Sequence, residues 1–265
     1  MPSASTAAAG TKPGAETIDL QEGNSHGILL LHGFGDTPQT LGLLARHLHD
    51  AGFDVKAPLL PGHGRSVEAF MTSTRREWLA CGREELARIR KNHRSVSIGG
   101  LSMGGAIAAI LAAESTEATD IESLVLIAPY LDMPVTARIA SATHWIWGRA
   151  AGVRKSNSPR SILDPEERKK NLGYGAYTGR LLYELWRIAA QARRALRDVT
   201  VPTLLIQSKA DPRIAPSVAE RAFATLPATE KKLSWAEGGG HIITVDFGRE
   251  KVFDEITDWI VKHQP

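Results

Sequence analysis

The chain contains Ser97-Ile98-Gly99-Gly100-Leu101-Ser102-Met103-Gly104-Gly105, which follows an apolar run and leads into a row of small residues. The pattern Gly100-x-Ser102-x-Gly104 in this context predicts a tight strand-to-helix turn with the serine at its apex, the arrangement called a nucleophile elbow. A serine at such an apex is forced towards positive φ, so its neighbours two before and two after must lack bulk. We expect its hydroxyl group to project from the edge of a sheet.

Strand and helix signals alternate on both sides of this turn. Strands are expected at 27–31, 53–57, 96–99, 123–129, 203–207 and 231–235, several of them continuous apolar runs typical of strands buried on both faces. Helices are expected at 37–51, 75–92, 106–113, 217–226 and 248–263. This alternation predicts an α/β fold with a mostly parallel central sheet and helices on both faces.

The region between Pro129 and Val201 interrupts the alternation. It has helical patterns at 134–148, 164–172 and 178–197 but no clear strand. An insertion that follows the carboxyl end of a strand lies over the crevice where open α/β sheets bind ligands. We therefore expect one core formed by residues 16–130 and 199–265, a small helical cap at 131–198 inserted in it, and a flexible tail at 1–15.

Charge is unevenly distributed along the chain. The formal net charge is only +3, and no dense basic stripe interleaved with aromatic residues is present, so we expect no nucleic-acid partner. Residues 131–198 alone hold 13 Lys/Arg and 6 Asp/Glu. A basic cap favours anionic substrates or transient contact with a lipid surface, whereas the simpler interpretation is that the arginines solvate the outside of short helices.

The sequence also predicts where the protein resides. No apolar run approaches membrane-spanning length, so we expect no stable membrane insertion. The first fourteen residues lack the basic start and apolar core of a signal peptide. The single cysteine, Cys81, cannot form an internal disulfide and fits a reducing compartment. A soluble cytoplasmic protein is the expectation, and the oligomeric state is left open.

A serine nucleophile needs a base and an acid. His241 follows three glycines in the loop after the strand at 231–235, and Asp211 follows the strand at 203–207. The chain order Ser102, Asp211, His241 is that of the α/β-hydrolases and differs from the two other common serine-protease orders. Asp132, which follows the preceding strand, is the competing acid. Asp246 lies too close to His241 in sequence and comes after it.

Negative charge that develops on an attacked carbonyl oxygen needs backbone donors. The amide of Met103 at the helix start is one expected donor. The second should come from the loop His32-Gly33-Phe34-Gly35 after the first central strand, where the glycines allow the Phe34 amide to turn inward. His32 and His63 are expected to form structural hydrogen bonds instead.

Several motifs together resemble those of a known family. They are His32-Gly33-Phe34-Gly35, Pro61-Gly62-His63-Gly64, Gly100-Leu101-Ser102-Met103-Gly104-Gly105, Asp211 in its strand-end setting, and Gly240-His241-Ile242-Ile243-Thr244-Val245-Asp246. These stretches resemble the bacterial carboxylesterases and monoacylglycerol lipases of the α/β-hydrolase fold. The resemblance runs from Gly27 to the C-terminus and is weakest in the cap, which carries more arginine than is usual for the family.

The resemblance implies hydrolysis of short- to medium-chain acyl esters, monoacylglycerols among them, through an acyl-enzyme. By position it implies Ser102 as nucleophile, Asp211 as acid, His241 as base, and Phe34 with Met103 as oxyanion donors. No cofactor is expected, and the histidines lack metal-binding spacing. The alternatives are other chemistry on the same fold (C–C hydrolysis, acyl transfer or perhydrolysis) or a noncatalytic ligand-binding protein.

Overall fold

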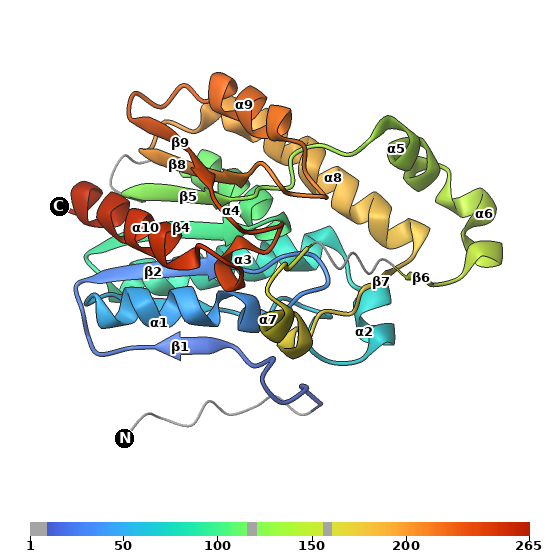
Figure 1. Ribbon diagram of the computed structural model, residues 1–265, viewed down its shortest axis with the longest axis horizontal. Helices are drawn as coiled ribbons and strands as arrows, with labels where there is room; N and C mark the ends of the chain where they lie inside the picture. Colours follow the sequence, from blue (N-terminus) through green and yellow to red (C-terminus); the bar gives the residue numbers. More distant parts are fainter. Residues whose placement is uncertain (1–9, 116–120, 156–160) are drawn as a thin grey trace.

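The computed structural model describes residues 10–115, 121–155 and 161–265. Its centre is a seven-stranded sheet in the order β1-β3-β2-β4-β5-β8-β9 (Figure 1). The strands are β1 (Ile18–Leu20), β2 (His26–Leu31), β3 (Asp54–Ala57), β4 (Ser95–Leu101), β5 (Ser123–Ile127), β8 (Thr203–Ser208) and β9 (Lys231–Ala236). All neighbours pair in parallel except the edge strand β1, which runs antiparallel to β3. The predicted α/β fold with a mostly parallel sheet is confirmed.

The two faces of the sheet bury different helices because side chains alternate along each strand. On β2, Leu29 and Leu31 join the apolar cluster under α3, α4, α8 and α9, whereas Ile28 and Leu30 join the cluster under α1 and α10. These helices are α1 (Gly42–Asp50), α3 (Arg75–Asn92), α4 (Met103–Glu114), α8 (Gly179–Ala195), α9 (Pro216–Thr225) and α10 (Arg249–His263). The core is therefore two apolar layers, one on each side of the sheet.

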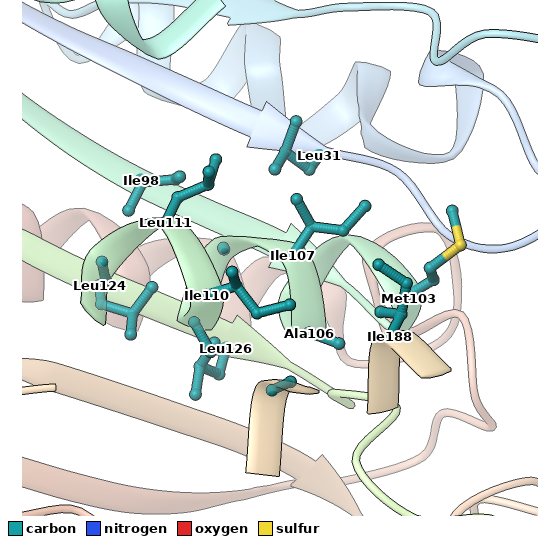
Figure 2. Packing of buried hydrophobic residues seen from close by; sticks show 14 of the residues in the cluster. Leu31, Ile98, Met103, Ala106, Ile107, Ile110, Leu111, Leu124, Leu126 and Ile188 are labelled. Atoms are coloured by element: carbon teal, nitrogen blue, oxygen red, sulfur yellow. The ribbon is translucent and has the colours of Figure 1, made fainter. Parts of the chain in front are cut away.

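Helix α4 lies in the middle of one layer. Ten of its residues are buried, and Figure 2 shows Ile107, Ile110 and Leu111 among the side chains of β2, β4 and β5. Close approach to the sheet depends on glycine, because a Cβ atom on Gly104 would lie 1.9 Å from the carbonyl oxygen of Leu31. The small residues after the elbow thus allow α4 to pack directly on β2, the strand that precedes the loop at 32–35.

The segment 131–198 contains α5 (Val135–Ala142), α6 (His144–Ala151), β6 (Arg154–Lys155), α7 (Pro165–Lys170), β7 (Ala176–Tyr177), α8 and a 3-10 turn at Leu196–Asp198. Helix α8 packs on α4, and α5 and α6 pack on α8 beyond the carboxyl ends of the strands (Figure 1). The helix expected at 134–148 is broken in two at Thr143, and β6 and β7 form a small antiparallel pair where no strand was expected. Two-residue strands are too short to show a periodicity.

Three other short elements were also absent from the predicted order. They are β1, α2 (Val67–Thr72) and the 3-10 turn at Ile243–Val245, while another 3-10 turn at Pro38–Leu41 precedes α1. Residues 10–15 of the expected tail contact the body, since the Lys12 amide donates to the Gly64 carbonyl and Ala15 is fully buried. Residues 1–9 of that tail lie outside the described residues.

The close contact of α4 with β2 predicts a large cost for Gly104→Ala. The added methyl group would meet the Leu31 backbone, which cannot move without disturbing the sheet, so we expect a loss of roughly 2–4 kcal/mol in the free energy of unfolding. Gly148→Ala in α6 is the matched control, because its nearest neighbour would be 4.0 Å away. Helix propensity should make the control neutral or more stable by up to about 1 kcal/mol. Urea denaturation measures both, and equal stability of the two variants would contradict the packing argument.

Candidate active site

Ser102 occupies the turn between β4 and α4 in a strained backbone conformation. Its φ is 56° and its ψ is −115°, and among described residues other than glycine only Ala128 also has a positive φ. A Cβ atom on Gly100 would lie 2.2 Å from the Gly104 carbonyl carbon, so the turn closes only with glycine there. The Ser102 amide donates to the Ile127 carbonyl (2.9 Å), and its own carbonyl accepts from Tyr130 (2.9 Å). These bonds hold the predicted elbow in place.

His241 is brought to the serine from the loop after β9. Its Nε2 lies 2.9 Å from Ser102 Oγ, and its Nδ1 lies 2.8 Å from Asp211 Oδ2. With the proton on Nδ1, the ring donates to the carboxylate and accepts from the hydroxyl group. The backbone amides of His241 and Ile242 both donate to the Ser161 carbonyl at 2.9 Å, which fixes the loop. The three side chains form one hydrogen-bonded chain.

Asp211 is held by more than the histidine. Its Oδ1 accepts from the amides of Arg213 (2.7 Å) and Ile214 (3.1 Å), and its Oδ2 also accepts from Gln207 Nε2 (2.9 Å). Burial acts to raise the pKa of Asp211, but the hydrogen bond and charge of His241 and these donors outweigh it and hold the pKa below its usual value. The carboxylate is therefore ionised beside the imidazole.

Asp132, the competing acid, has other partners. Its carboxylate lies 2.6 Å from Arg193 Nη1 and 3.4 Å from Arg221 Nη2. It makes no hydrogen bond to His241 within the described residues. The geometry thus pairs Asp211, and not Asp132, with the histidine.

The loop at 32–35, which the sequence predicts to supply an oxyanion donor, lies beside the serine. Phe34, Ser102 and His241 line one cavity of about 630 Å³. The Phe34 ring packs edge-on against Phe70 and Trp78, which anchors the loop. The Phe34 amide donates to no other described residue, and the amide of Met103, the first residue of α4, has no acceptor within its helix. Two backbone donors are therefore available near the serine.

His32 and His63 lie behind this loop in structural positions. His32 is fully buried; its Nδ1 donates to the Gly33 carbonyl (3.0 Å) and its Nε2 accepts from the Leu60 amide (3.1 Å). Burial and the neighbouring His63 hold the pKa of His32 well below its ordinary value, and burial lowers the pKa of His63 to about 4. Neutral rings with fixed hydrogen bonds support the loop and do not face the cavity.

Two carboxylates near the site have roles that the sequence did not indicate. Asp246 is fully buried and accepts from the amides of Leu163 (2.7 Å), Asp164 (2.8 Å), Gly240 (2.7 Å) and Phe247 (2.9 Å). It therefore ties the histidine loop to the segment before α7. Asp36 lines the cavity itself, and burial raises its pKa to about 6 against the opposing charges of His241 and Arg213.

Two kinds of feature are absent from the described part of the chain. No group of three His, Cys, Asp or Glu side chains there is placed to hold a metal ion. None of the helices in these ranges has the length and apolar character needed to cross a membrane.

The four bonds to Asp246 predict that Asp246→Ala destabilises the protein. Besides its neighbour Phe247, the carboxylate joins two other segments of the chain, Leu163–Asp164 and the loop at Gly240. We therefore expect a loss of roughly 2–4 kcal/mol in the free energy of unfolding. Asp254→Ala on α10 is the control. The Asp254 side chain is 71 % exposed and its ion pair with His47 is 3.5 Å long, so its removal should cost less than about 0.5 kcal/mol. A similar urea midpoint for both variants would contradict the role given to Asp246.

This chain is similar to hydrolases of known function, several of them lipases or esterases. The family model described as serine aminopeptidase, S33, matches residues 24–247. A thermostable monoacylglycerol lipase from Bacillus sp. (strain H-257) is 29% identical over 250 residues, which cover 94% of this chain and 96% of that protein. A carboxylesterase from Bacillus subtilis (strain 168) is 26% identical over 249 residues, covering 91% and 94%. A structure reported for LipS and LipT, two metagenome-derived lipolytic enzymes, has a TM-score of 0.87 and 28% identity, covering 96% of this chain and 100% of that one.

Proposed function

The chain belongs to the serine aminopeptidase S33 family and is an ester hydrolase of the α/β-hydrolase fold, and we propose that it cleaves short- to medium-chain acyl esters, monoacylglycerols among them, through an acyl-enzyme on Ser102. The observation that carries the proposal is the hydrogen-bonded chain from Ser102 Oγ through His241 to Asp211 at the wall of the cavity.

In the proposed mechanism Ser102 Oγ attacks the ester carbonyl while His241 Nε2 removes its proton. The ionised carboxylate of Asp211 stabilises the imidazolium ion that forms. The amides of Phe34 and Met103 donate to the negative carbonyl oxygen. His241 then gives its proton to the leaving alcohol, and a water molecule, deprotonated by the same ring, attacks the acyl-enzyme. Collapse releases the carboxylic acid and returns the proton to Ser102.

The size and lining of the cavity support the proposal of a short- to medium-chain acyl group. Its volume is about 630 Å³, and part of its lining is apolar: Ala137, Ile162, Leu182, Leu185 and Ile242. Several of these residues come from the segment 131–198, which supports the proposal that this segment acts as a cap over the core. An apolar wall close to the nucleophile holds the acyl part away from water.

The proposed roles predict a steep and selective loss of activity. We expect Ser102→Ala to lower kcat for p-nitrophenyl butyrate by about 10⁴-fold or more and Asp211→Asn by about 10⁴-fold, because triad members act as a unit. Asp132→Asn is the matched control and should stay within about threefold of the native protein, since its partners are Arg193 and Arg221.

A fluorophosphonate probe separates the alternatives. Labelling of the native protein but not of Ser102→Ala supports nucleophilic chemistry, whereas absence of labelling indicates a ligand-binding protein. Labelling with slow turnover of simple esters would favour acyl transfer, perhydrolysis or C–C hydrolysis. Near-native esterase activity of Ser102→Ala would refute the proposal.

We also propose transient contact with an anionic lipid surface through α5 and α6. Trp145 is 75% exposed and Ile146 is 65% exposed, and the exposed apolar residues Val135 and Ile139 lie on the neighbouring helix. Exposed Arg154 and Lys155 form β6, a short distance after α6 in the chain. Apolar side chains next to positive charge are the features that bind the interface of a negatively charged membrane.

This proposal predicts that Trp145→Ala with Ile146→Ala weakens binding to vesicles that contain anionic phospholipid, by about tenfold or more in a sedimentation assay. Val261→Ala is the control, because Val261 is also exposed but lies near the end of α10, away from the cap. Turnover of a dissolved p-nitrophenyl ester should change little in either protein. Equal vesicle binding by the double variant and the native protein would contradict lipid contact through this surface.

A further inference from the structure

Asp36 places a second carboxyl group beside the nucleophile. It follows the oxyanion loop directly and lines the same cavity as Ser102 and His241. A Cβ atom built on Gly33 would lie 2.9 Å from Asp36 Oδ2 and 3.5 Å from Ser102 Cβ. The carboxyl group and the serine therefore flank the same glycine, and a substrate bound at Ser102 passes next to Asp36.

The other side of this carboxyl group meets the segment that closes the cavity. A Cβ atom on Gly173 would lie 2.8 Å from Asp36 Oδ1, and the Tyr174 amide donates to the Gly35 carbonyl at 2.9 Å. Asp36 is half-buried, yet neither oxygen has a hydrogen-bond or ion-pair partner among the described residues. The charges of His241 and Arg213 offset part of the lost hydration, but no protein hydrogen bond replaces it. A ligand that donates a hydrogen bond would supply one.

The groups around Asp36 limit which class of ligand it can bind. The carbonyl oxygen of the substrate faces the amides of Phe34 and Met103 in the proposed mechanism, and the apolar wall suits the acyl chain, so the alcohol part remains for Asp36. A positively charged alcohol is disfavoured because Arg213 lines the same cavity and its charge acts on Asp36. A neutral hydroxyl group can donate to the carboxylate without this repulsion.

We propose that Asp36 accepts a hydrogen bond from a free hydroxyl group of the alcohol part, so that the enzyme prefers esters of polyols to esters of simple alkyl alcohols with the same acyl chain. The inference rests on the proposed ester hydrolysis at Ser102 and adds a specificity-determining residue to it. Asp36 acts on substrate choice, whereas Asp211 acts on the proton transfer.

The test compares glycerol monobutyrate with propyl butyrate, which share the acyl chain and a three-carbon alcohol. We expect the native protein to show a higher kcat/KM for the glycerol ester, and Asp36→Ala to reduce the ratio of the two values by about tenfold or more, as the loss of a hydrogen bond to a charged acceptor implies. Asp36→Asn keeps one acceptor oxygen and should give an intermediate ratio. Asp132→Ala is the matched control and should keep the native ratio and the native rates.

The outcomes are separable. An unchanged ratio in Asp36→Ala overturns the inference, and so does a native protein that hydrolyses both esters equally well, a result that needs no variant to fold. Hydrolysis of p-nitrophenyl butyrate with no preference between the two butyrates refutes only the role of Asp36. No turnover of any of the three esters refutes the proposed function, and the role of Asp36 with it.

Discussion

The contact between helix α4 and strand β2 is the constraint on which the rest of the site depends. Because a single added carbon at Gly104 would collide with the Leu31 carbonyl, the helix can start only where Ser102 has already turned the chain sharply. The strained φ of the serine is maintained by the apolar layer that α4 forms with the sheet and with α8 (Figure 2). Packing thus supplies the free energy that keeps the hydroxyl group at the edge of the sheet.

The parallel sheet then brings distant residues to that edge. Strands β4, β8 and β9 end on the same side, so Ser102, Asp211 and His241 leave their strands close together although up to 139 positions separate them. Strand ends alone do not fix an imidazole to within a hydrogen bond of a hydroxyl group. The loop needs its own supports, which are the Ser161 carbonyl and the Asp246 carboxylate.

The sequence therefore predicted the elements that have a periodic or continuous apolar pattern and the turn whose local sterics require glycine. Buried strands show as apolar runs, long helices such as α3 show periodic patterns, and the elbow shows as glycines around a serine, so the order of the core elements and the positions of Ser102, Asp211 and His241 could be inferred. The elements that were not predicted, β1, α2 and the β6–β7 pair, are two to six residues long and lack the apolar runs that mark the core strands. Asp246 and Asp36 could not be assigned either, because their partners or surroundings come from residues far away in the chain.

Three carboxyl groups around one histidine show why position, and not residue type, decides their chemistry. Asp211 and Asp36 both lose hydration, but Asp211 gains His241, Gln207 and two amides, and its pKa falls, whereas Asp36 gains no hydrogen bond and its pKa rises to about 6. Both carboxylate oxygens of Asp246 accept hydrogen bonds from backbone amides, four in all, and the residue has a structural role. A buried carboxylate whose partners all come from the protein is structural or positions another group. A carboxylate that faces the cavity without a protein hydrogen bond can gain one only from a molecule that enters the cavity. For Asp36 that molecule would carry a neutral hydrogen-bond donor beside the ester bond.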